Sequence, residues 1–181
     1  MNVVERIVAL HAALDAAGVP HAFGGALALA WCTERARGTV DIDVNVFVSH
    51  DAAGEVFDAL PEGVAVTDDA RRAVAADGQA RLWWGRTPID LFFNTVAFHE
   101  QAATRARVEA FAGHRIPFLA CRDIAVFKVF FDRTQDWADL EQMAAAGTLD
   151  TETVAAVIAA HLGPDDPRIE RLRSLGPSGR P

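Results

Sequence analysis

The sequence predicts an α+β fold, in which helices flank a mixed β-sheet and a C-terminal helical extension follows. Short apolar segments in the first two thirds of the chain alternate with a period of two, as strands do. From residue 121 onward the spacing becomes helical, and Gly147 and Gly163-Pro164 separate the segments. The length of 181 residues suits one domain with a small extension.

The expected elements follow in order along the chain. Residues 2–17 form an amphipathic helix that ends at Gly18-Val19-Pro20, and Ala26–Cys32 form a short helix. Strands are expected at 39–48, 63–67, 80–84, 88–94, 107–111 and 115–118. Further helices are expected at 51–60, 97–105, 121–132, 134–146, 150–162 and 166–174. This pattern divides the chain into a core at 1–120, a helical part at 121–175 and a disordered tail at 176–181.

Charge and cysteine content narrow the class of protein. The formal net charge is -8, so the chain is not built to coat nucleic acid by bulk attraction, and a nucleic-acid substrate requires a local basic groove. Cys32 and Cys121 form no CxxC pair, which predicts neither a disulfide nor a zinc site and favours the cytoplasm. The N-terminal helix carries Glu5 and Arg6, unlike a signal peptide, and no apolar run predicts a membrane span.

Three aspartates interrupt apolar strands. Asp41 and Asp43 lie two residues apart in TVDIDVNVFV, so both carboxylates lie on one face of the strand, opposite Val40 and Ile42. Carboxylates this close repel each other, and a divalent cation such as Mg²⁺ or Mn²⁺ removes the conflict. Asp90 lies in a second strand, TPIDLFFN, and approaches the pair if the two strands are neighbours. A solvated edge strand explains the Asp-x-Asp pattern alone equally well.

Gly24-Gly25 precedes the short helix that begins at Ala26. Two glycines allow a sharp turn and a close approach to a ligand, and the helix start offers free N–H groups to phosphate. On its own, the pair is better explained as a simple strand-to-helix turn. Trp83-Trp84 could stack on a base, although the interior of the sheet is the favoured place for both.

These features together carry a resemblance to a known family. The string FGGALALAWCTERARGTVDIDVNV resembles the signature of the DNA polymerase β-like nucleotidyltransferases: two glycines, a helix, a strand with Asp-x-Asp, and a third carboxylate on a later strand. Within that superfamily the chain is most similar to the AbiEii/AbiGii-type nucleotidyltransferase toxins, through GGALAL, RGTVDID and VFKVFFDRTQDWADL. Ala26 departs from the pattern, because it replaces a common Ser or Thr that binds phosphate.

The resemblance implies a magnesium-dependent transfer of a nucleoside monophosphate from an NTP to a hydroxyl acceptor. Asp41, Asp43 and Asp90 would hold the metal, and Asp90 would also activate the acceptor hydroxyl. Lys128, the only lysine, would reach the triphosphate. At helical spacing it also shares one side with Asp132, Asp136 and Asp139, which fits an i,i+4 salt-bridge ladder as well. The other implied nucleotide-binding residues are Gly24, Gly25, Arg37, Arg133 and Asp136.

Three functions are compatible with the sequence. The first is a toxin acting on RNA, such as the tRNA acceptor end, with an antitoxin protein as its partner. The second is an antibiotic-type nucleotidyltransferase that modifies a small hydroxyl compound, which the acidic net charge favours. The third is a non-catalytic nucleotide-binding domain, which Ala26 favours.

Overall fold

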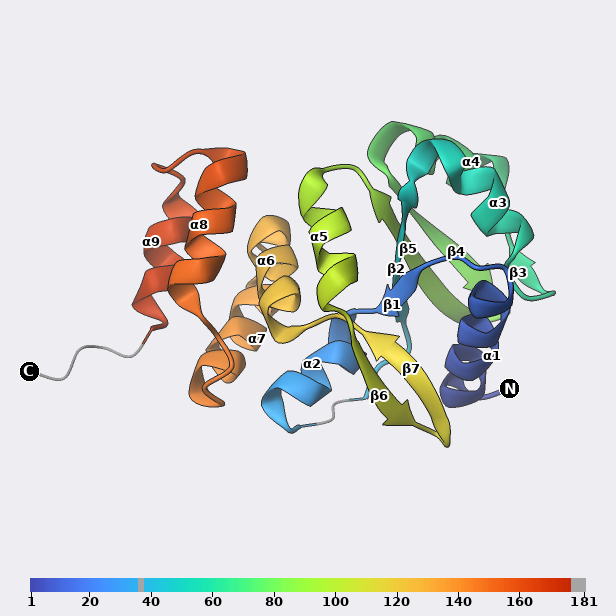
Figure 1. Cartoon of the computed structure of the whole chain (residues 1–181), viewed down its shortest axis with the longest axis horizontal. Helices are drawn as coiled ribbons and strands as arrows, with labels where there is room; N and C mark the ends of the chain where they lie inside the picture. Colours follow the sequence, from blue (N-terminus) through green and yellow to red (C-terminus); the bar gives the residue numbers. More distant parts are fainter. Residues whose placement is uncertain (36–37, 177–181) are drawn as a thin grey trace, which may run out of the picture. The chain divides into compact units, whose positions relative to one another are not determined.

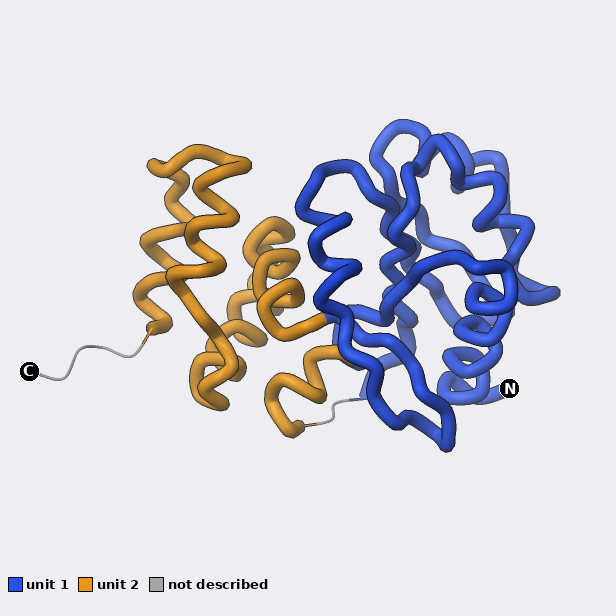
Figure 2. Tube along the Cα trace, viewed as in Figure 1, with its two compact units in different colours: residues 1–27, 38–119 blue, residues 28–37, 120–181 orange. Residues whose placement is uncertain are grey.

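The computed structural model describes residues 1–35 and 38–176, and its chain forms two compact units (Figures 1 and 2). The first unit comprises residues 1–27 and 38–119, and the second comprises 28–37 and 120–181. Residues 28–37 thus group with the C-terminal helices, while the predicted domain boundary after residue 120 stays a prediction. This grouping reflects helix α2 (Gly25–Thr33), because Cys32 near its end is bonded to Cys121 and accepts a hydrogen bond from Thr148.

Within the described residues, the first unit contains one seven-stranded mixed sheet of order β3-β4-β5-β2-β1-β7-β6. Strand β2 is parallel to β5 and β1 is parallel to β7, whereas the other neighbours are antiparallel. The strands are β1 (His21–Phe23), β2 (Ile42–Ser49), β3 (Val64–Ala65), β4 (Gln79–Trp84), β5 (Thr87–Asn94), β6 (Arg107–Phe111) and β7 (His114–Phe118). The helices are α1 (Val3–Ala16), α3 (Ala53–Asp58), α4 (Asp68–Asp77) and α5 (Ala97–Arg105), with a 3₁₀ turn at His50–Ala52.

One face of the central strands forms the core of this unit. Alternate residues of β2 and β5 are fully buried there and are paired in register: Ile42 with Ile89, Val44 with Leu91 and Val46 with Phe93. Helix α3 contributes Phe57, whose ring meets Phe93 edge-on, and α1 contributes Arg6, whose guanidinium lies over the Trp84 ring. The residues between them on β2 and β5, including Asp43 and Asp90, lie on the opposite face.

The structure corrects three local expectations in the first unit. Strand β2 begins at Ile42, so Asp41 precedes the strand, and Val40 is 70% exposed instead of packed beside Ile42. Helix α4 (Asp68–Asp77) was not predicted, because only Ala70 and Val74 are buried on it. That apolar stripe is too narrow to be recognised by its period. The expected helix at 51–60 is shorter and begins with a 3₁₀ turn.

The second unit is helical, as expected from residue 121 onward. Helices α6 (Cys121–Phe131), α7 (Thr134–Ala145), α8 (Thr151–Leu162) and α9 (Pro167–Ser174) match the expected ranges to within one residue. Helix α6 packs against α7 and α8, and α8 packs against α9. Ala125, Val129 and Trp137 are buried in this unit. No helix among the described residues has the length and apolar character that crossing a membrane requires.

The expectation that the two cysteines stay unpaired is wrong. Cys32, near the end of α2, forms a disulfide with Cys121 at the start of α6, and their Cα atoms are 5.5 Å apart. The two residues are separated by 89 positions in the sequence, and only the fold brings them together. The side chain of Thr148 supports the same junction by donating a hydrogen bond to the carbonyl oxygen of Cys32.

Reduction of this disulfide is expected to destabilise the protein. Closing a loop of this length restricts the unfolded chain, so its loss should lower the free energy of unfolding by about 2–4 kcal/mol. The unfolding midpoint should then fall by roughly 5–15 °C. Circular dichroism melts with and without a phosphine reductant measure the shift, and the Cys32→Ser, Cys121→Ser double variant should be insensitive to the reductant. Equal midpoints for the wild-type protein in both conditions would contradict the prediction.

Candidate active site

Two of the three predicted acids are paired in register on neighbouring parallel strands. Asp43 on β2 is the Cα partner of Asp90 on β5, so the expectation that the two strands are neighbours is confirmed. Both lie on the face of the sheet opposite the core, and the carboxylate of Asp41, just before β2, reaches the same group of side chains through Arg81. The Asp41 and Asp90 side chains are 38% and 19% exposed, so solvent reaches the group.

Arg81 on β4 joins the acids and was not among the predicted site residues. Its Nε and Nη2 atoms donate to the two carboxylate oxygens of Asp90, each at 2.7 Å, and its Nη2 lies 3.6 Å from Oδ2 of Asp41. The hydrogen bonds from Arg81 to Asp90, together with the negative charge of the three aspartates, raise the pKa of the guanidinium above its usual value. Arg81 therefore stays charged among the three acids.

The sequence contained a signal for Arg81. A two-residue turn at Gly85-Arg86 joins β4 to β5, and a turn of this length fixes the register of a hairpin. Counting outward from Trp84 opposite Thr87 places Arg81 opposite Asp90, as observed. The same register separates the two tryptophans: Trp84 is buried, whereas Trp83 is 48% exposed on the face that carries Arg81.

Gly24 and Gly25 lie directly against Asp43. The N–H of Gly24 donates to the carbonyl oxygen of Asp43 at 2.9 Å, which extends the pairing of β1 with β2 by one residue. Gly25 begins α2 with a φ of +53°, and a Cβ built on it would lie 1.8 Å from Oδ2 of Asp43. No side chain fits there. The glycine pair therefore places the start of α2 in contact with a site carboxylate.

The donor chemistry of the three acids fits a hard divalent cation. Carboxylate oxygens are the ligands that Mg²⁺ and Mn²⁺ take in proteins, and neighbouring strands bring Asp43 and Asp90 within reach of one ion. Among the described residues, however, no three His, Cys, Asp or Glu side chains are arranged to hold a metal. In this structure the guanidinium of Arg81 binds both oxygens of Asp90, so a metal at Asp90 would have to compete with it.

Lys128 and Asp136 belong to the second unit and are bound to each other. Lys128 is 7% exposed, and its ammonium group lies 2.6 Å from Oδ2 of Asp139 and 3.4 Å from Oδ1 of Asp136. Burial alone would raise the pKa of Asp136, but the hydrogen bond from Arg133 and the charge of Lys128 outweigh it and lower that pKa. Two cations and two carboxylates thus neutralise each other, an arrangement that stabilises the fold. Nucleotide binding by Lys128, Arg133 and Asp136 stays a prediction.

The predicted salt-bridge ladder forms in part: Lys128 pairs with Asp136 and Asp139, whereas Asp132 has other partners. Helix α6 ends at Phe131, and Asp132 adopts a left-handed conformation with φ of +53°. Its carboxylate accepts a hydrogen bond from the Trp137 indole at 2.6 Å. Arg37, the other predicted cation, lies outside the described residues.

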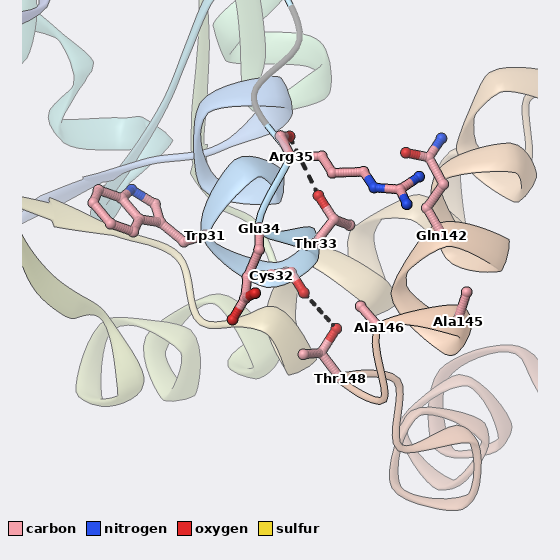
Figure 3. Close-up of a pocket in the computed structure, with 9 residues that line it drawn as sticks. All are labelled: Trp31, Cys32, Thr33, Glu34, Arg35, Gln142, Ala145, Ala146 and Thr148. Carbon is pink, nitrogen blue, oxygen red and sulfur yellow. Dashed lines mark hydrogen bonds between the residues drawn. The ribbon is translucent and has the colours of Figure 1, made fainter.

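A pocket of about 420 Å³ lies within the second unit, between α2 and α7 (Figure 3). Arg35 and Gln142 point toward each other across it. The two threonine hydroxyls that line the pocket make hydrogen bonds within the protein. Thr33 donates to the carbonyl oxygen of Leu29, and Thr148 donates to the carbonyl oxygen of Cys32. None of the three acids lines this pocket.

Solved structures with this arrangement of elements are nucleotidyltransferases, and the expected fold class is confirmed: the chain has the nucleotidyltransferase fold. Two structures of the antibiotic-resistance factor ANT(2″)-Ia each match 94% of this chain. The solution structure has a TM-score of 0.57 at 17% identity over 89% of that chain. The crystal structure, in complex with adenylyl-2″-tobramycin, has a TM-score of 0.61 at 16% identity over 97% of that chain.

A third match is an antigenic nucleotidyltransferase-like protein from Paracoccidioides brasiliensis. Its TM-score is 0.55 at 12% identity, over 96% of this chain and 92% of that one. No family model and no curated protein match the sequence. At these identities the structures show the fold alone, so the resemblances to the polymerase β-like superfamily and to AbiEii-type toxins stay predictions.

Proposed function

We propose that this protein transfers a nucleoside monophosphate from an NTP to a hydroxyl group of a small-molecule acceptor, with Mg²⁺ or Mn²⁺ held by Asp41, Asp43 and Asp90. One observation carries the proposal. Asp43 and Asp90 are paired in register on parallel strands, and Asp43 lies against Gly25, which has no room for a side chain. A simple turn would not require glycine against a carboxylate, whereas a phosphate site at a helix start requires close approach of the backbone.

The residues divide the reaction between them. The triphosphate binds to the backbone of Gly24 and Gly25 and to the first N–H groups of α2. Ala26 has no hydroxyl, so only backbone groups bind the phosphates here. Asp90 accepts the proton of the acceptor hydroxyl, whose oxygen forms a bond to the α-phosphorus as the bond to the β-phosphate oxygen breaks. Pyrophosphate leaves. The metal, when bound, supplies positive charge to the phosphates and the leaving group.

A small acceptor is favoured over RNA for two reasons. The net charge of -8 opposes bulk attraction of a polyanion. ANT(2″)-Ia, whose fold this chain shares, is an antibiotic-resistance factor crystallised with adenylyl-2″-tobramycin, a small adenylylated compound. The tRNA acceptor and the antitoxin partner stay predictions that rest on the sequence resemblance.

Labelled NTPs test the proposal directly. The protein is incubated with each of the four α-labelled NTPs and Mg²⁺, with either a panel of aminoglycosides and related hydroxyl compounds or total tRNA, and EDTA is added to parallel samples. Label on a small acceptor that disappears with EDTA supports the proposal. Label on tRNA alone would show that the acceptor is tRNA instead of a small molecule. Absence of label, together with absence of metal-dependent NTP binding, would overturn the enzymatic assignment and leave a non-catalytic role.

Replacement of Trp83 is expected to weaken nucleotide binding. The indole lies on the sheet face of Arg81 and Asp90 and is half exposed, so it can stack on a base. Because one stacked base contributes about 1–3 kcal/mol, Trp83→Ala should raise the KM for the NTP roughly 5- to 150-fold while kcat changes little. Trp31→Ala is the matched control, since Trp31 is similarly exposed but lies in the second unit. Equal KM values for the two variants would exclude this role for Trp83.

A further inference from the structure

Arg81 is the feature that the proposed reaction leaves unexplained. Its guanidinium engages both oxygens of Asp90 and approaches Asp41, yet the side chain itself is half exposed. Residues at an exposed strand position usually carry no more than a solvated charge. Here the charge lies among the three carboxylates that would hold the metal.

We infer that Arg81 is a positioning residue that holds the three acids together in the metal-free protein and that a divalent metal must displace. The inference rests on the proposed function for the location of the metal site. Three carboxylates on one sheet face repel one another, and one guanidinium relieves part of that repulsion. Arg81 therefore holds the Asp90 carboxylate in one orientation before the metal arrives.

The geometry makes Arg81 and the metal competitors. Both oxygens of Asp90 already accept a hydrogen bond from Arg81 at 2.7 Å, in the planar two-point arrangement that arginine forms with carboxylates. A metal that binds an Asp90 oxygen must share it with, or take it from, a group of the same charge. Arg81 can move away from Asp90 because its side chain is half exposed and the buried side chains of its strand lie on the other face.

The displaced guanidinium stays on the same face as the acids, because β4 and β5 are fixed in register. Phosphate is the other ligand that matches the fork of an arginine. When metal and NTP bind together, Arg81 exchanges one anionic partner for another, whereas metal alone leaves it without a new partner. The wild-type protein should therefore bind metal weakly alone and more tightly with NTP, a positive coupling between the two ligands.

Metal binding without nucleotide tests the inference. Free Mn²⁺ is measured by electron paramagnetic resonance during titration of the wild-type protein, Arg81→Gln and the control Arg72→Gln. Arg72 is an exposed arginine of the same unit that pairs with Asp69 on its own helix. Arg81→Gln should bind Mn²⁺ at least tenfold more tightly than the wild-type protein, and Arg72→Gln should match the wild type. Adding Asp43→Asn to Arg81→Gln should abolish the gain.

Unchanged or weaker Mn²⁺ binding by Arg81→Gln would overturn the inference, as would absence of binding in both proteins. If Arg81→Gln fails to fold, Arg81→Lys keeps the charge without the two-point geometry, and its Mn²⁺ affinity should still exceed that of the wild type. Affinity equal to or below the wild type for this variant also counts against the inference. Because no NTP or acceptor is present, the result is independent of nucleotidyl transfer: an inactive protein can confirm the displacement, and an active one can refute it.

Discussion

Asparagine in place of Asp43 should reduce nucleotidyl transfer about a thousandfold, a loss that corresponds to roughly 4 kcal/mol of transition-state stabilisation. The substitution keeps the shape of the side chain and removes the charge that faces Asp90 and the start of α2. Steady-state rates with saturating Mg²⁺ and NTP measure the effect. Asp41→Ala should likewise abolish transfer without unfolding the protein, because Asp41 precedes the strand and is partly exposed.

Asp69→Asn is the matched control for Asp43→Asn. Asp69 lies on α4 in the same unit, is almost fully exposed and pairs with Arg72. It should retain wild-type rates, and the unfolding midpoints of the two asparagine variants should agree within a few degrees. Turnover of NTP by Asp43→Asn or Asp41→Ala at a rate near that of the wild type would refute the assignment of these residues to the reaction.

Gly25→Ala is expected to damage both the fold and the site. The new methyl group would lie 1.8 Å from an oxygen and 2.5 Å from the carboxyl carbon of Asp43, and the backbone has a φ of +53°, which disfavours side chains. Either the carboxylate or the start of α2 must move. We expect a loss of about 1–3 kcal/mol in the free energy of unfolding and a fall of at least a hundredfold in kcat/KM. Chemical denaturation and steady-state kinetics measure the two effects.

Gly54→Ala controls for the loss of a glycine as such. Gly54 lies in α3, its φ is ordinary for a helix, and a Cβ built on it has no heavy atom within 4 Å. Alanine there should leave the rate unchanged and stabilise the helix by up to about 1 kcal/mol. Wild-type activity in Gly25→Ala would show that the contact with Asp43 is not required, and the role of the glycine pair would then be that of an ordinary turn.

Periodicity predicted most of the helices and strands because their buried faces are wide and regular. Strand β5 and helix α7, for example, were recognised to within one residue. Helix α4 escaped because two small buried residues, Ala70 and Val74, define its inner face. The disulfide was not predicted for a different reason. Pairing of Cys32 with Cys121 depends on the tertiary fold and leaves no local pattern in the sequence.

The candidate site was predicted in part. The alternation of apolar residues in β2 and β5 was sufficient to place Asp43 and Asp90 on the strand faces opposite the core. The observed register then pairs the two residues. The position of Arg81 opposite Asp90 follows only from counting residues along the hairpin from Gly85. Its two hydrogen bonds to Asp90 depend on the side-chain conformation, which the sequence does not specify. The surroundings of Lys128 were predicted in part: helical spacing placed Asp136 and Asp139 beside it, but the end of helix α6 before Asp132 was not foreseen.

Helix α2 has a consequence for attempts to dissect the protein. It starts at Gly25 in the sheet unit, but Ala28, Leu29 and Cys32 are buried and belong to the helical unit. A chain that stopped at residue 119 would keep these apolar residues and lose the helices with which they group. Neither unit is a continuous stretch of sequence, so a single cut, by protease or by gene truncation, cannot separate two intact halves.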